Sequence, residues 1–233
     1  YYIKQYEEET NLKSHIILDS SASMSFASEI AAGKEKRITK FAYASFVAAA
    51  LSYLMMQQRD AVGLYLYDAE IRTSIPPRAT KAHLHRILAE LERTSPSNAT
   101  HSALSLNRLA DRISRRGLII VLSDLFDNPD EIITALKHFR HDGHEVIVMH
   151  VLDPLEQSFA FGNDAIFKDV ETGDMITTQP YHIQREYQKT MRTFIERYKK
   201  ECRENLIDYV LLDTATSFDV ALFNYLNKRK RIG

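Results

Sequence analysis

Short apolar runs alternate with stretches of helical periodicity along most of the chain. Apolar runs bounded by turn residues predict strands, and apolar residues three and four apart predict helices that face a core. We expect strands at 15–18, 60–67, 71–75, 117–123, 145–151 and 206–212. We expect helices at about 39–58, 80–93, 100–115, 128–141, 183–203 and 217–228. This alternation is typical of a mostly parallel sheet with helices on both faces.

The connection between the second and third strands sets the topology. Asp68 and Ala69 are too short a link for a parallel crossover, so the third strand must be antiparallel. Pro76 and Pro77 are expected to end it. We therefore predict an α/β fold with a doubly wound, mostly parallel six-stranded sheet of order 3-2-1-4-5-6. Strand 3 is antiparallel in this sheet, and a β-hairpin is added at about 157–179.

Composition and charge indicate which kinds of partner and which cellular location to expect for the domain. The chain has 30 Lys and Arg against 31 Asp and Glu, so its net charge of -1 favours neither nucleic acid nor an anionic membrane. The basic run at 228–231 is expected to be a solvated tail. The apolar run at 41–56 is shorter than the ~20 residues of a membrane-spanning helix, which predicts a buried helix instead. The single cysteine, Cys202, fits a reducing compartment, and we expect a cytoplasmic location.

The sequence predicts a single domain preceded by a short extension. Residues 14–233 are expected to form one domain. Residues 1–13 are expected to be an extension left from a longer chain, because the sequence starts at Tyr1 without a methionine or a signal-peptide pattern.

Two aspartates follow predicted strands at their carboxyl ends. Asp19 comes after the first strand and Asp124 after the fourth. These strands are neighbours in the predicted order, and the crevice at their carboxyl ends is where ligands bind in such sheets. Two carboxylates close together would repel each other, and a bound cation would remove that cost.

Hydroxyl groups accompany both aspartates. The loop after Asp19 carries Ser21 and Ser23, and the loop between two predicted helices carries Thr100. An all-oxygen set of two carboxylates and three hydroxyls suits a hard cation such as Mg²⁺, or Mn²⁺, better than zinc. With two carboxylates the site would be weak, and its incomplete shell would leave room for water or an incoming acidic side chain.

These residues resemble the metal-ion-dependent adhesion site of von Willebrand factor A (VWA) domains. The motif is Asp19-x-Ser21-x-Ser23, with Thr100 in its loop and Asp124 after the fourth strand. The wider pattern resembles a bacterial family that carries such a domain, the domain-of-unknown-function family fifty-eight. Three segments, 6–10, 18–24 and 167–173, carry that resemblance, which covers nearly the whole chain.

The resemblance implies a function as well as a fold. It implies that Ser21, Ser23 and Thr100 contact the metal, with Asp19 and Asp124 binding directly or through water. A carboxylate of a partner protein would complete the shell. Members of the family are often encoded beside MoxR-type AAA+ ATPases, which suggests such a partner. Ala22 and Ala99 depart from the family pattern, where glycine is common, and a positive φ at Ala22 would be strained.

Two other readings of the sequence stay open. One is a Mg²⁺-dependent phosphohydrolase centred on Asp19, although no general acid or phosphate-gripping lysine accompanies that residue in the sequence. The other is a scaffold whose metal site is empty. We expect no enzyme activity, because the sequence contains neither a Gly-x-Ser-x-Gly elbow nor a glycine-rich phosphate loop. His138 and His141, with His144 nearby, are expected to form a solvated helix end and not a zinc site.

Overall fold

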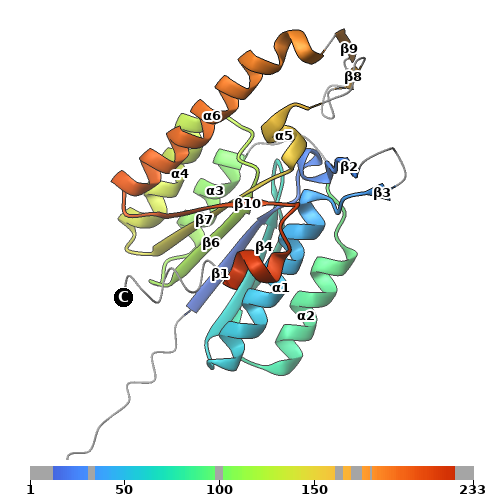
Figure 1. The fold of residues 1–233 in the computed structure, drawn as a ribbon. Helices are drawn as coiled ribbons and strands as arrows, with labels where there is room; N and C mark the ends of the chain where they lie inside the picture. Colours follow the sequence, from blue (N-terminus) through green and yellow to red (C-terminus); the bar gives the residue numbers. More distant parts are fainter. Residues whose placement is uncertain are drawn as a thin grey trace, which may run out of the picture.

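The computed structural model describes residues 13–30, 35–97, 102–160, 165–168, 175–178 and 180–223. A six-stranded sheet with the order β10-β7-β6-β1-β4-β5 forms the centre of the fold (Figure 1). Counted along the chain, this is the predicted order 3-2-1-4-5-6, which is confirmed. The strands are β1 (Lys13–Asp19), β4 (Ala61–Tyr67), β5 (Ile71–Arg78), β6 (Leu118–Ser123), β7 (Glu145–Leu152) and β10 (Asp208–Asp213).

The edge strand β5 is antiparallel to β4, as its short connection predicts. The expectation that Pro76 and Pro77 end this strand is wrong, because β5 continues to Arg78, which pairs with Val62 after a register shift. Proline lacks the N–H that a central strand needs, but an edge strand leaves one side unpaired and tolerates it.

Helices cover both faces of the sheet (Figure 1). On one face, α1 (Lys40–Gln57) and α2 (Lys81–Arg93) pack over Ile16, Leu18 and their neighbours. On the other face, α3 (Ser102–Arg112), α4 (Pro129–His141) and the long α6 (Pro180–Glu204) pack over Ile17 and its neighbours. Residues of β1 therefore alternate between two cores, which explains the continuous apolar run of a strand buried on both sides.

The helix starts follow local capping chemistry. The Thr39 side chain accepts from Ala42 N at 3.1 Å, and Asn128 caps α4 before Pro129. The predicted helix bounds hold within about three residues, with α3 ending at Arg112 and α6 starting at Pro180. The predicted end of the last helix, at 228, lies outside the described residues. No described helix is long and apolar enough to cross a membrane.

The smaller elements lie around the carboxyl edge of the sheet or beyond it, except the last short helix, which lies beside α1 with Phe218 stacked on Phe46 (Figure 1). They are η1 (Ala22–Ser25), β2 (Glu29–Ile30), β3 (Glu35–Lys36), α5 (Pro154–Ser158), β8 (Ala165–Lys168) and β9 (Met175–Thr178), with a further helix over 218–223. β8 pairs antiparallel with β9 at the place of the expected hairpin. The predictions for residues 1–12, for Ala99 and Thr100, and for the basic run 228–231 concern residues outside the described ranges.

Candidate functional site

The loop after β1 is shaped around the carboxylate of Asp19. Ser20 turns the chain by donating from both its amide (2.7 Å) and its hydroxyl (2.9 Å) to the Tyr67 carbonyl at the end of β4. The Ser21 amide then donates to Asp19 Oδ1 at 2.9 Å. These bonds turn the hydroxyls of Ser21 and Ser23 towards each other, 3.2 Å apart. Two of the predicted hydroxyl ligands thus converge beside the first aspartate.

Ala22 follows Ser21 as the first residue of η1. Its φ is not among the positive values of the described residues. Alanine in place of the usual glycine therefore puts no strain on this loop.

Asp124 stands at the end of β6, the neighbour of β1. The next residue, Leu125, has a φ of 57°, a left-handed conformation that a non-glycine residue adopts at some cost. The Ser123 hydroxyl accepts from Leu125 N at 2.9 Å and donates to Asp19 Oδ2 at 2.7 Å. One buried serine therefore fixes the turn that carries Asp124 and links it to Asp19.

A lysine that the sequence argument overlooked lies in this site. Lys40, the first residue of α1, is fully buried. Its Nζ donates to Asp124 Oδ2 at 2.7 Å and to Glu156 Oε1 at 2.5 Å. The same ammonium lies 4.7 Å from the centre of the Phe126 ring. This ammonium is enclosed by Asp124 and Glu156 and is not free to grip a phosphate group.

Glu156 owes its position to the start of α5. Asp153, after β7, accepts from Leu155 N at 2.8 Å, while the Glu156 carboxylate accepts from Asp153 N at 2.9 Å. This is a capping box. Asp153 also accepts from Ser28 N at 3.0 Å, so it ties the loop before α1 to the same edge of the sheet.

The carboxylates of the site differ in their affinity for protons. Burial and the charge of Asp124 raise the pKa of Asp19 to about 6. Burial would raise the pKa of Asp124 too, but the charge and hydrogen bond of Lys40 outweigh it and hold that pKa low; the Ser23 hydroxyl also lowers it. Burial raises the pKa of Glu156 to about 7 despite Lys40. When all three of these carboxylates are ionised, the ammonium of Lys40 alone does not balance their negative charge.

His150 supports the site from the adjacent strand. Its Nε2 lies 2.9 Å from the Asp124 carbonyl oxygen and its Nδ1 lies 2.7 Å from the Tyr209 hydroxyl. Burial lowers the pKa of His150 to about 4, so the ring is neutral near pH 7. A neutral imidazole in this position orients the backbone of Asp124 without adding charge.

Comparison with known proteins identifies the family. A model of the family described as "Protein of unknown function DUF58" matches residues 1–197. The chain belongs to the DUF58 family. It is 25% identical over 175 residues to the uncharacterized protein Mb1516 of Mycobacterium bovis and, with the same figures, to Rv1480 of Mycobacterium tuberculosis. The match covers 74% of this chain and 52% of each relative, so this DUF58 chain spans about half the length of the curated relatives it matches.

Solved structures show the fold of this DUF58 domain. An aerotolerance-related membrane protein from Bacteroides fragilis has a TM-score of 0.59 at 20% identity, covering 93% of this chain and 99% of that chain. The conserved hypothetical protein BatB from Bacteroides thetaiotaomicron has a TM-score of 0.56 at 18% identity, covering 94% and 99%. The SpRpn10 VWA domain has a TM-score of 0.50 at 8% identity, covering 91% and 93%. The DUF58 domain therefore has a VWA-like fold.

The described residues of the DUF58 site fit a hard cation. Two enclosed carboxylates, Asp19 and Asp124, lie close enough to raise a pKa, and the hydroxyls of Ser21 and Ser23 converge beside them. Such oxygen atoms would hold Mg²⁺ or Mn²⁺. The fifth predicted ligand, Thr100, lies outside the described residues.

The other polar candidates in the DUF58 domain have structural partners. His83 Nε2 lies 2.7 Å from the Val62 carbonyl, and His144 Nε2 lies 2.9 Å from the Ile113 carbonyl, so both are buried and bonded to backbone. The expectation of a surface residue is wrong for His144, whereas the side chain of His141 is 90% exposed. Within the described residues, no group of three or more His, Cys, Asp or Glu side chains is placed to hold a metal.

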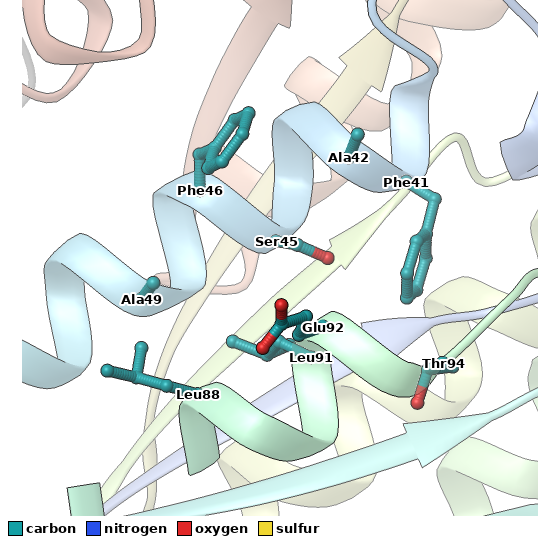
Figure 2. Close-up of a pocket in the computed structure, with 9 residues that line it drawn as sticks. All are labelled: Phe41, Ala42, Ser45, Phe46, Ala49, Leu88, Leu91, Glu92 and Thr94. Carbon is teal, nitrogen blue, oxygen red and sulfur yellow. The ribbon is translucent and has the colours of Figure 1, made fainter. Parts of the chain in front are cut away.

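A separate apolar groove of about 520 Å³ runs between α1 and α2 (Figure 2). Phe46 and Leu88 line it and are partly exposed, and Glu92 is its one charged lining residue. The groove lacks the converging oxygen atoms of the Asp19 site, so it is not a second candidate for a cation.

Proposed function

We propose that this domain is a non-catalytic protein-binding module that holds Mg²⁺ or Mn²⁺ and uses it to engage an acidic side chain of a partner. The ligands would be Asp19, Ser21, Ser23, Thr100 and Asp124. The observation that carries the proposal is the pair of buried carboxylates at the ends of β1 and β6, with two hydroxyls beside them. When bound, the cation would supply an open coordination position for a carboxylate.

The charge of the site supports a divalent ion. Among the described residues, the site holds three carboxylates, of Asp19, Asp124 and Glu156, and one ammonium, that of Lys40, which pairs with Asp124 and Glu156. With all groups ionised, two negative charges remain in a buried site, where they are costly unless paired. A divalent cation balances them. The hydroxyls of Ser21 and Ser23 add no charge, so the bound ion keeps its attraction for a further carboxylate.

The choice of partner is supported by the resemblance to the family and not by the geometry. The sequence of this domain resembles proteins that are often encoded beside MoxR-type AAA+ ATPases. We therefore propose such an ATPase as the partner. An acidic side chain on its surface would complete the metal shell. This mode of binding needs no nucleophile and no general base. Asp19 would act only as a ligand, and hydrogen bonds from Ser21 and Ser123 hold its buried carboxylate in place.

The test uses calorimetry and affinity capture. Mg²⁺ is titrated into the wild-type domain and into an Asp19→Ala, Asp124→Ala double variant. We expect saturable heat in the wild type only, and equal heats in both would count against the site. The MoxR-type ATPase is then captured on the domain with and without chelator, with Thr100→Ala as the point variant. Capture that ignores both chelator and Thr100→Ala would favour a metal-free scaffold. Phosphate-ester turnover lost in Asp19→Asn would favour a hydrolase.

A further inference from the structure

The feature that the proposed site does not explain is the ammonium of Lys40. A lysine almost never lies fully buried unless it is paired. Here it is enclosed between Asp124 Oδ2 at 2.7 Å and Glu156 Oε1 at 2.5 Å, beneath the ring of Phe126. It also stands at the N-terminal end of α1, where the helix dipole disfavours a cation. A buried ammonium in this unfavourable position therefore needs an explanation.

We propose that Lys40 is a built-in competitor of the divalent cation for Asp124, and that Glu156 holds its ammonium when Asp124 turns to the ion. This inference rests on the proposed cation site. It makes Lys40 and Glu156 a pair that determines the affinity of the site for metal, although neither is a metal ligand.

The hydrogen bonds of Asp124 show why the two cations compete. Its Oδ1 accepts from Phe126 N at 3.2 Å and its Oδ2 accepts from Lys40 Nζ, so both oxygens are already engaged. An ion that shared Oδ2 with the ammonium would bring two positive charges within a few ångströms in a buried site, where repulsion is strong. Binding therefore requires the ammonium to withdraw from Asp124.

Glu156 makes that withdrawal possible. Its Oε2 is fixed by Asp153 N, which leaves Oε1 on the ammonium. When Lys40 leaves Asp124 it keeps one carboxylate partner, and an unpaired buried ammonium is avoided. Without the negative charge of Glu156, Lys40 would have Asp124 as its remaining anion and would hold it more firmly.

Replacing Lys40 and replacing Glu156 should therefore change the affinity for Mn²⁺ in opposite directions. Free Mn²⁺ is measured by electron paramagnetic resonance up to millimolar concentrations, with Mn²⁺ alone as the probe. Lys40→Met should tighten Mn²⁺ binding about tenfold or more, because the ion no longer has to displace a charge-assisted hydrogen bond from Asp124. Glu156→Gln should weaken binding by a similar factor. Lys137→Met, which breaks the distant ion pair with Glu201, is the matched control and should change nothing.

A background variant separates competition from a general effect of charge. In Asp124→Asn, the ammonium has no carboxylate to give up at this position. Lys40→Met should then change Mn²⁺ affinity less than threefold. An equal gain in both backgrounds would overturn the proposal, because simple repulsion between the ammonium and the ion would explain it. Unchanged affinity in Lys40→Met would overturn it as well.

Folding gives a second readout, because Lys40→Met leaves two buried carboxylates without their cation. If this variant is unfolded in chelator, millimolar Mn²⁺ should refold it and chelator should unfold it again. Failure to fold in Mn²⁺ would contradict the proposal.

The failure of this inference is distinguishable from that of the site itself. Loss of Mn²⁺ binding in Asp19→Ala alongside unchanged affinity in Lys40→Met would keep the site and reject the competitor. Binding by Lys40→Met alone, with none by the wild type, would support the competitor and reject a resident ion.

Discussion

Replacing Asp19 by asparagine tests the electrostatics of the site most simply. The substitution keeps the shape of the side chain and removes one of the two adjoining buried charges. In the presence of chelator, we expect Asp19→Asn to be more stable than the wild type at pH 8. In the presence of Mg²⁺ the order should reverse, because the wild type gains stability from the ion and the variant gains little.

The magnitude follows from the pKa of Asp19. A rise from 3.8 to about 6 corresponds to roughly 3 kcal/mol of destabilisation in the ionised form. The folded state holds this proton more tightly than the unfolded state between about pH 4 and 6, so the free energy of unfolding falls as pH rises through that window. Asparagine cannot accept from both Ser21 N and Ser123 Oγ, as Asp19 does, which costs about 1 kcal/mol. The net gain at pH 8 is then about 2 kcal/mol.

Urea unfolding of both proteins at pH 5 and pH 8, each with chelator and with Mg²⁺, gives the eight free energies of unfolding that this comparison needs. At pH 5, where Asp19 of the wild type is largely protonated, the two proteins should differ by less than at pH 8. The reasoning is refuted if Asp19→Asn is less stable than the wild type at pH 8 in chelator, or if Mg²⁺ stabilises both proteins equally.

Two further predictions concern the supports of the site, and a third concerns the buried Cys202. Asp153→Ala removes the cap of α5 and leaves Ser28 N without its acceptor, so we expect a loss of about 2–4 kcal/mol in urea unfolding; a loss below about 1 kcal/mol would argue against this role. Ser123→Ala should cost about 1–3 kcal/mol and weaken Mg²⁺ binding in calorimetry, since Ser123 links Leu125 to Asp19. Burial raises the pKa of the Cys202 thiol to about 12, so a thiol reagent should label it only as fast as the domain unfolds.

The sequence predicted the sheet because its strands carry a strong signal. Runs such as the one that became β6 are buried on both faces and are apolar throughout. The two-residue link at Asp68 and Ala69 fixed the direction of β5. The end of β5 could not be read from Pro76 and Pro77, because whether a proline breaks a strand depends on whether the strand lies at an edge. That is a property of the whole sheet.

The site was predictable in part for a similar reason. Asp19 and Asp124 could be brought together because adjacent parallel strands end at the same edge. Thr100 stays a prediction. Lys40 was missed because it lies far along the chain from both aspartates. It nevertheless carried a signal, because it is a charged residue directly after the Thr39 cap in an otherwise apolar segment. The N-terminal end of a helix also repels cations, which makes a lysine there unusual. Glu156 follows β7, the parallel neighbour of β6, in a capping box with Asp153, but nothing in the sequence paired it with Lys40.

Crystals grown with Mn²⁺ test the central claim most directly, because the anomalous signal locates the ion. We predict one strong peak about 2 Å from the hydroxyl oxygens of Ser21 and Ser23. Asp19 and Asp124 should adjoin this peak, and the Lys40 ammonium should have drawn back to Glu156. A map without a peak beside these serines, at Mn²⁺ concentrations that saturate binding in solution, would contradict the account.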